Sequence, residues 1–80
     1  MRPWTVAGKI KHPNGEYTIT YAARGCITFI EARRRLIPHA NGEGGWLHTS
    51  YVIIRPDGSE KEYMRLRDAQ RAVEEEENHA

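Results

Sequence analysis

The chain has 80 residues, of which 12 are Lys or Arg and 11 are Asp or Glu, so its formal net charge is +1. With 39% hydrophobic residues it is too apolar and too neutral for a disordered segment. No apolar run approaches the roughly 18–20 residues that a membrane-spanning helix needs. A chain of this length holds one small domain, which we expect to span residues 1–80.

Cysteine usage and the first residues bear on the cellular compartment. Cys26 is the single cysteine, which excludes a disulfide within the chain. The first residues lack the apolar stretch of about 7–15 residues that a secretory signal carries. We therefore expect a reducing cytoplasm, either in a cell or in an infected host.

Two segments with the same turn chemistry predict β-hairpins. Residues 12–16 and 55–59 both place a proline, then Asn or Asp, then a glycine that takes the left-handed conformation. The flanking segments 4–11 and 17–21 alternate apolar and polar residues as half-buried strands do. Segment 46–54 is more continuously apolar, which favours a central strand, and the charged segment 60–65 favours a sheet edge.

Each hairpin is followed by a helical pattern. Thr28 and Glu31 fit the capping box of a helix that ends before Pro38. A second helix is expected to begin near Asp68 and to fray over the acidic residues 74–80. The order ββα–ββα predicts an α+β fold, in which an antiparallel sheet of about four strands carries two helices.

Charge is divided unevenly along the chain. Residues 1–40 carry seven basic and two acidic side chains, whereas residues 41–80 carry five basic and nine acidic ones. This division is typical of a molecule with separate surfaces for anions and cations, unless the two halves intermix in space. A solvated helix face for the arginines and a solubilising tail for the glutamates are the alternatives to binding. The predicted partner-binding residues are Arg33, Arg34, Arg35, Asp57, Glu60, Glu62, Glu74 and Glu75.

Residues for catalysis or metal binding do not form a recognisable pattern. The four histidines fall at no ligand spacing, and Cys26 stands between Gly25 and Ile27, where a buried thiol is expected. The chain contains no nucleotide-binding or serine-nucleophile motif. The aromatic residues of the strands are expected mainly in the core. The sequence therefore favours a protein that is not an enzyme and that holds no cofactor and no metal.

The layout resembles a known group of proteins. Tight hairpins at 12–16 and 55–59, a short helix capped by Thr28 and clustered surface charge in 80 residues are similar to the small phage-encoded anti-CRISPR proteins, above all those acting on type I surveillance complexes. The resemblance implies an inhibitor that docks on such a nucleoprotein complex and blocks target-DNA binding or nuclease recruitment. That group shares no common motif, so no functional residue is carried over.

Two other functions stay open, and neither involves a membrane. Lys9 and Lys11, together with Arg33–Arg35, are compatible with a small regulator that binds the nucleic-acid backbone directly. The third interpretation is a structural module that forms a homodimer by pairing exposed strand edges.

Overall fold

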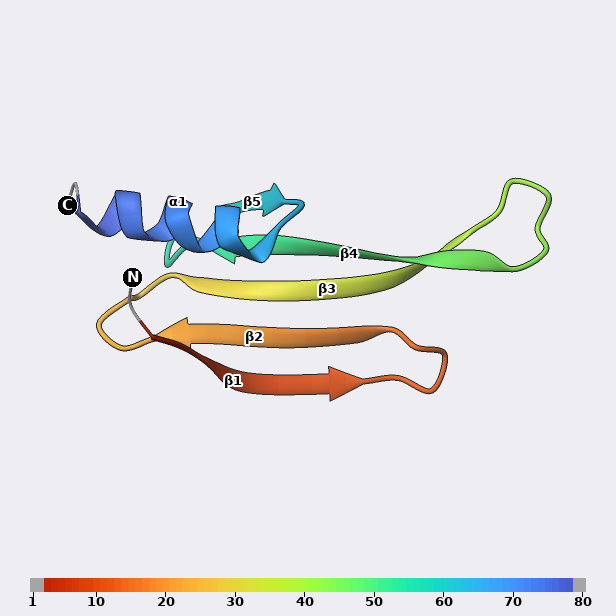
Figure 1. Ribbon diagram of the computed structural model, residues 1–80, viewed down its shortest axis with the longest axis horizontal. Coiled ribbons are helices and arrows are strands. Elements are labelled where there is room, and N and C mark those ends of the chain that lie inside the picture. Colours follow the sequence, from red (N-terminus) through yellow and green to blue (C-terminus); the bar gives the residue numbers. More distant parts are fainter. Residues whose placement is uncertain (1–2, 79–80) are drawn as a thin grey trace.

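The structure, a computed structural model, describes residues 3–78 and forms one antiparallel sheet with one helix (Figure 1). The five strands lie in the sheet in chain order, β1-β2-β3-β4-β5, so every strand pairs with its neighbours in sequence. A single α-helix follows the last strand. The elements are β1 Trp4–Lys11, β2 Tyr17–Ala23, β3 Phe29–Pro38, β4 Gly45–Ile54, β5 Glu60–Tyr63 and α1 Leu66–Asn78.

Both predicted hairpins are confirmed. In the first turn the Gly15 amide donates to the His12 carbonyl at 3.1 Å, and the His12 amide donates to the Glu16 carbonyl at 2.9 Å. The second turn repeats this pattern between Arg55 and residues 58–59. Gly15 has a φ of +93°, a conformation that glycine adopts without the steric cost of a Cβ atom. The expected edge position of β5 and the internal position of β4 are confirmed as well.

The fold class predicted from the sequence is wrong, because the segment after Thr28 is a strand. The order is not ββα–ββα: β3 runs from Phe29 to Pro38 and pairs with β4 over ten residue pairs. The alternation of Ile30 and Ala32, both buried, with Glu31 and Arg33 follows the period of a strand. Only the second helix forms, and it begins at Leu66, near the predicted start at Asp68.

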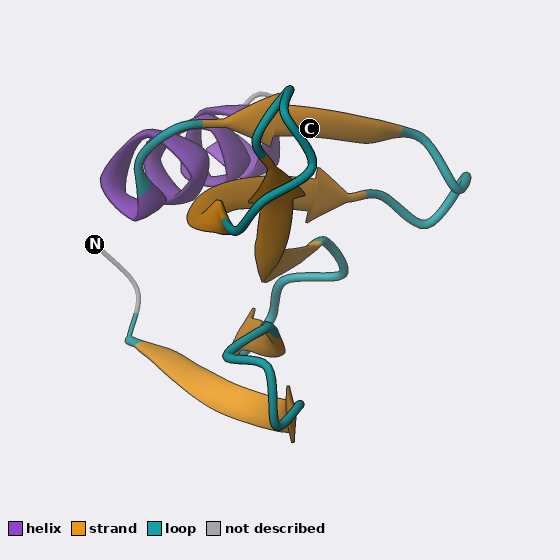
Figure 2. Ribbon diagram, turned by 90° about the vertical axis from the view of Figure 1, so that its right-hand side faces the viewer, coloured by secondary structure: helices purple, strands orange, loops and turns teal. Residues whose placement is uncertain are grey.

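The core lies where α1 covers one face of the sheet. Ile30 of β3 and Ile53 of β4 are fully buried against Ala69 and Val73 of the helix. The helix contacts β3, β4 and β5, and it leaves β1 and much of β2 uncovered on the same face (Figure 2). Most strand aromatics pack against the core as predicted, and burial raises the pKa of Tyr21. The aromatic residues in contact with the core are Trp4, Tyr21, Tyr51 and Tyr63.

Within residues 3–78, no helix or further strand lies over the opposite face of the sheet. The side chains of the strands themselves cover this face. Arg33 crosses from β3 toward β5: its Nε donates to Glu31 at 2.8 Å, and its guanidinium pairs with Glu60 at 3.2 Å. The hydrogen bonds with Glu60 and then Glu31 raise the pKa of Arg33. This network spans the strand that holds Val52, which is only 4% exposed on that face.

The molecule is elongated because the β3–β4 hairpin projects beyond the rest of the sheet (Figure 1). Its extents are 47 × 23 × 21 Å and its radius of gyration is 14.3 Å. A compact domain of this length has a radius of gyration of about 12 Å. Pairing between β2 and β3 ends at Arg34, and pairing between β4 and β5 ends at Tyr51. We call residues 35–48, which form this projecting two-stranded hairpin, the arm.

Candidate functional site

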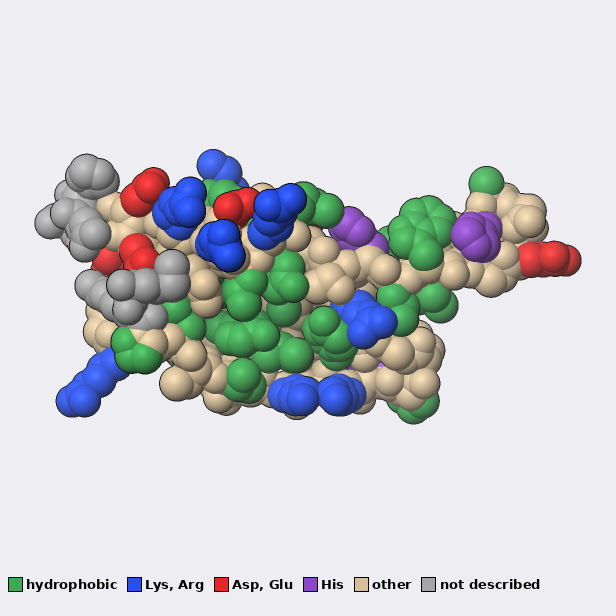
Figure 3. All heavy atoms as spheres, in the orientation of Figure 1, with side chains coloured by type: hydrophobic (Ala, Val, Ile, Leu, Met, Phe, Trp, Pro, Cys, Tyr) green, Lys and Arg blue, Asp and Glu red, His purple; other side chains and the backbone are tan. Residues whose placement is uncertain are grey.

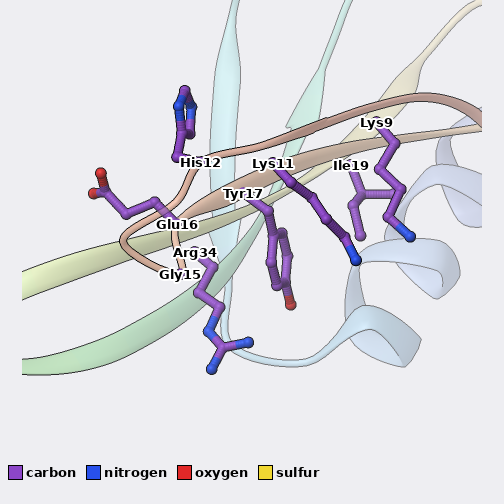
Figure 4. Close-up of a pocket in the computed structure, with 8 residues that line it drawn as sticks. All are labelled: Lys9, Lys11, His12, Gly15, Glu16, Tyr17, Ile19 and Arg34. Carbon is purple, nitrogen blue, oxygen red and sulfur yellow. The ribbon is translucent and has the colours of Figure 1, made fainter.

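A row of three side chains crosses the uncovered part of the helix-bearing face. Lys11 of β1 is paired with Tyr17 of β2, which is in turn paired with Arg34 of β3. The next row along the strands places Lys9 beside Ile19. Figure 4 shows the side chains of Lys9, Lys11, Tyr17 and Arg34 extending to the same side of the sheet. The Tyr17 ring on β2 therefore lies between cations on the two neighbouring strands, β1 and β3.

These side chains line a groove of about 310 Å³ that is bounded at one end by the first hairpin turn. Gly15 of this turn lies against Leu47: a Cβ atom added to it would be 3.2 Å from Leu47 Cδ1. The turn thus contacts the arm and closes that end of the groove. The lining residues are Lys9, Lys11, His12, Gly15, Glu16, Tyr17, Ile19 and Arg34.

Glu16 is the one acidic residue of the groove, and its carboxylate is held at the rim. It accepts hydrogen bonds from the Asn14 side-chain amide at 2.9 Å and from the Leu36 backbone amide at 3.0 Å. These two bonds lower the pKa of Glu16 from its ordinary value of 4.5, so it stays ionised at neutral pH. Figure 4 shows Glu16 and His12 pointing away from the two lysines. The carboxylate therefore fixes the turn to β3 and does not fill the groove.

The groove cations have no acidic partner among residues 3–78. The ion pairs of the described chain involve Arg33 and Arg55, and none involves Lys9, Lys11 or Arg34. With Glu16 counted, three cations and one carboxylate leave the groove electropositive. Figure 3, drawn from the same side as Figure 1, shows Lys and Arg side chains beside a band of hydrophobic side chains over the sheet.

Tyr17 forms the floor of the groove and orients the Arg34 side chain. The Arg34 guanidinium carbon lies 5.4 Å from the centroid of the Tyr17 ring, within the range of a cation–π contact. Such a contact restrains a long side chain without neutralising its charge. Tyr17 and Ile19 are half-buried, so an apolar surface lies between the charged groups. The arrangement presents positive charge and a flat apolar surface to the same ligand.

The structure separates the three consecutive arginines. Because neighbouring strand residues point to opposite faces, Arg34 enters the groove while Arg33 and Arg35 lie on the other face. Arg33 is neutralised by its two carboxylates. Arg35 donates to the Tyr17 carbonyl at 3.1 Å and to the Thr18 hydroxyl at 3.2 Å, so it ties β3 to β2. Only one of the three predicted basic residues is available to the groove.

The predicted acidic residues are distributed over the second hairpin and the helix. Asp57 accepts from the Ser59 amide at 2.8 Å, and the contacts with Ser59 lower the pKa of Asp57. Glu60 pairs with Arg33, and Glu62 lies on the same exposed strand β5. The predicted Glu74 and Glu75 lie on α1.

The acidic end of the helix makes a contact of its own. The helix continues through Asn78, and Glu76 pairs with Arg55 of the second turn. Residues 79–80 of the segment expected to fray lie outside the described residues.

Sequence reasoning missed Tyr17 as a groove residue, because it assigned the strand aromatics to the core. Its pairing with Lys11 follows from the hairpin at 12–16, which places the two residues that flank the turn opposite each other. Arg34 carries no such local signal, because its place opposite Tyr17 depends on β3 being a strand.

Residues 3–78 contain no cluster of three or more His, Cys, Asp or Glu side chains arranged to hold a metal ion. Nor does this part contain a helix with the length and apolar character to cross a membrane. His79 lies outside the described residues. The chain matches no known protein-family model, no curated protein and no solved structure.

Proposed function

We propose that this protein is a non-enzymatic module that binds single-stranded nucleic acid along the groove lined by Lys9, Lys11, Tyr17 and Arg34. The observation that carries the proposal is the row Lys11–Tyr17–Arg34, in which unpaired cations lie on either side of an aromatic ring. Proteins that bind single strands combine a positive groove for the phosphates with aromatic side chains for the bases.

The apolar floor favours a single strand over a duplex. A duplex offers mainly its phosphate backbone to a sheet face, whereas a single strand also exposes bases that contact Tyr17 and Ile19. The groove is lined by residues of three strands, β1 to β3, so we expect it to take a few nucleotides. Affinity is expected to come from phosphate contacts first, with little sequence preference.

The inhibitor function implied by the resemblance to anti-CRISPR proteins stays a prediction. Part of its basis was a short helix capped by Thr28, and that segment is a strand. Of the acidic residues, Glu60 and Glu76 are already engaged by arginines. The unpaired cations of the groove favour a polyanion, so we place direct nucleic-acid binding first.

Fluorescence anisotropy with a labelled oligothymidine strand and with a duplex of equal length tests the proposal. Three phosphate contacts predict that the logarithm of the association constant falls with the logarithm of salt concentration with a slope of about −2 for a single strand. Arg34→Ala is expected to weaken binding and to reduce that slope by about 0.7. Binding of a poly-glutamate competitor with equal affinity would show a general polyanion site instead.

Arg24, an exposed arginine in the loop between β2 and β3, provides a matched control. Tyr17 begins β2 and Arg24 follows its last residue, so the two lie at different ends of the strand. Arg24→Ala removes the same charge without touching the groove, so its affinity and salt slope are expected to equal those of the wild type. Equal losses in Arg24→Ala and Arg34→Ala would refute the groove as the binding site. So would the absence of binding by the wild type at low salt.

A further inference from the structure

One strand edge of the sheet has no partner over six residues. β5 pairs with β4 only from Tyr51 to Ile54, so no described strand lies against the outer edge of β4 from Gly45 to Ser50. This segment, Gly-Trp-Leu-His-Thr-Ser, contains no Asp, Glu, Lys, Arg or Pro. An unpaired edge of this composition is a template for another strand, because its backbone amides and carbonyls point outward.

The two outermost strands, by contrast, carry features that oppose edge-to-edge pairing. β1 has a bulge between Val6 and Gly8, and it presents Lys9 and Lys11. β5 is four residues long, and three of the four are charged. Bulges, lysines and short charged strands are the common means by which proteins protect a sheet edge. The open edge of β4 lacks all of them.

The arm gives a second and independent reason to expect a partner. Over residues 35–38 and 45–48 the sheet is only two strands wide, and a two-stranded hairpin without further packing is marginally stable in water. The arm also exposes apolar side chains: Trp46 is 50% exposed and Leu36 is 42% exposed. Its other edge is partly protected, since Glu16 accepts from the Leu36 amide. The unprotected side is again the edge of β4.

We propose that a second copy of this chain occupies the edge, so that segment 45–50 of each copy pairs in antiparallel orientation with the same segment of the other. Antiparallel self-pairing places a neutral segment opposite itself, so no like charges face each other across the new ladder. The symmetric arrangement satisfies both open edges at once and closes as a dimer. The arms of the two copies then form a sheet four strands wide at the centre of the dimer.

The two-fold axis of such a pair is perpendicular to the sheet, so the two copies keep the same face on the same side. The two basic grooves therefore lie on one side of the dimer. If the proposed function holds, one strand of nucleic acid engages both grooves, and the second contact benefits from a high effective concentration. The self-pairing itself does not depend on what the groove binds, and its test contains no nucleic acid.

Sedimentation velocity on the wild type and on two charge variants of His48 tests the proposal. His48 lies near the middle of the open segment, so in the dimer it approaches its own counterpart. The wild type is expected to shift from monomer to dimer between low-micromolar and near-millimolar concentration. His48→Glu and His48→Lys each place like charges near the axis, and each is expected to stay monomeric. An equimolar mixture of the two variants is expected to restore the dimer, because opposite charges then face each other.

Three outcomes would overturn the proposal: a wild type that stays monomeric throughout, dimers in both single variants, or a mixture that stays monomeric. Arg35 is opposite His48 within the chain, so it faces the substituted side chain in each variant and in the mixture alike. Thermal melts of each variant check that it is folded. Hydrogen exchange of the wild type gives an independent reading: protection of amides in 45–50 must rise with concentration while that of β1 amides stays constant.

Discussion

Gly45 occupies the last pair of the β3–β4 ladder at a place where the structure leaves no room for a side chain. A Cβ atom on Gly45 would lie 2.4 Å from the Ile37 carbonyl oxygen and 3.1 Å from Pro38 Cα. Both neighbours are backbone atoms, so rotation of a side chain does not relieve the overlap. Gly45→Ala is therefore expected to push the two strands of the arm apart at this end.

The magnitude follows from the position of the clash. Overpacking a well-packed site costs about 1–3 kcal/mol. Because Pro38 and Gly45 form the terminal pair, fraying of one pair relieves the overlap, and we expect a cost near the low end. About 1 kcal/mol lowers the melting temperature of a domain of this size by roughly 4–8 °C.

Gly8→Ala is the matched control, because it makes the same chemical change on another strand. Its added Cβ atom would meet Thr20 at 3.9 Å, an ordinary van der Waals distance. Restricting the unfolded chain is expected to leave this variant as stable as the wild type or about 0.4–1 kcal/mol more stable.

Urea unfolding of both variants, with hydrogen exchange of the arm amides, gives the comparison. A midpoint for Gly45→Ala equal to or above that of Gly8→Ala would refute the close approach at the end of the arm.

Two further predictions concern stability. Ile53 is 0% exposed in a core of four buried residues. Ile53→Ala is therefore expected to lower the free energy of unfolding by about 2–5 kcal/mol, out of the roughly 4–12 kcal/mol available to a domain of this size. A nearly unchanged thermal melt would contradict the central position of Ile53. Glu16 has a lowered pKa in the folded protein. The stabilisation that its ionised carboxylate gives to the fold is therefore complete above pH 4.5, the ordinary pKa of a glutamate, and is lost as the pH falls through the folded-state pKa. Glu16→Gln is therefore expected to melt below the wild type at neutral pH, with the difference closing in acid; a difference that is constant with pH would exclude this role for the carboxylate.

The features that the sequence predicts correctly depend on local chemistry. The turns at 12–16 and 55–59 need only a proline, a short polar residue and a glycine at fixed positions, and these suffice wherever the strands lie. The helix that begins near Asp68 is predicted from Ala69, Ala72 and Val73, two of which the structure buries. In both cases the residues that decide the structure are neighbours in the chain.

Residues 28–37 were predicted as a helix and form a strand, because their apolar residues fit both the helical and the strand periodicity. Phe29, Ala32 and Leu36 fit one face of a helix, and Ile30, Ala32 and Arg34 fit one face of a strand. Ten residue pairs with β4 select the strand, and these partners are between 7 and 25 residues away in sequence. No pattern within 28–37 contains that information.

The candidate site was predicted in part for the same reason. Lys9 and Lys11 were identified as basic residues of one strand, and their pairing with β2 follows from the first turn. Arg34 joins them only because β3 is a strand in the register that places it opposite Tyr17. A helix would have spread Arg33–Arg35 around its surface, whereas the strand assigns one arginine to the groove and two to the other face.

The strand order has a consequence for how the chain acquires its structure during synthesis. Each strand pairs with the strand made just before it, so every pairing partner in the sheet is already present when the next strand emerges. The helix that seals Ile30 and Ile53 is the last element to appear. Until Ala69 and Val73 are in place the nascent protein exposes Ile30 and Ile53, which makes the first turns of α1 the step that decides between a folded molecule and one exposed to chaperones or proteases.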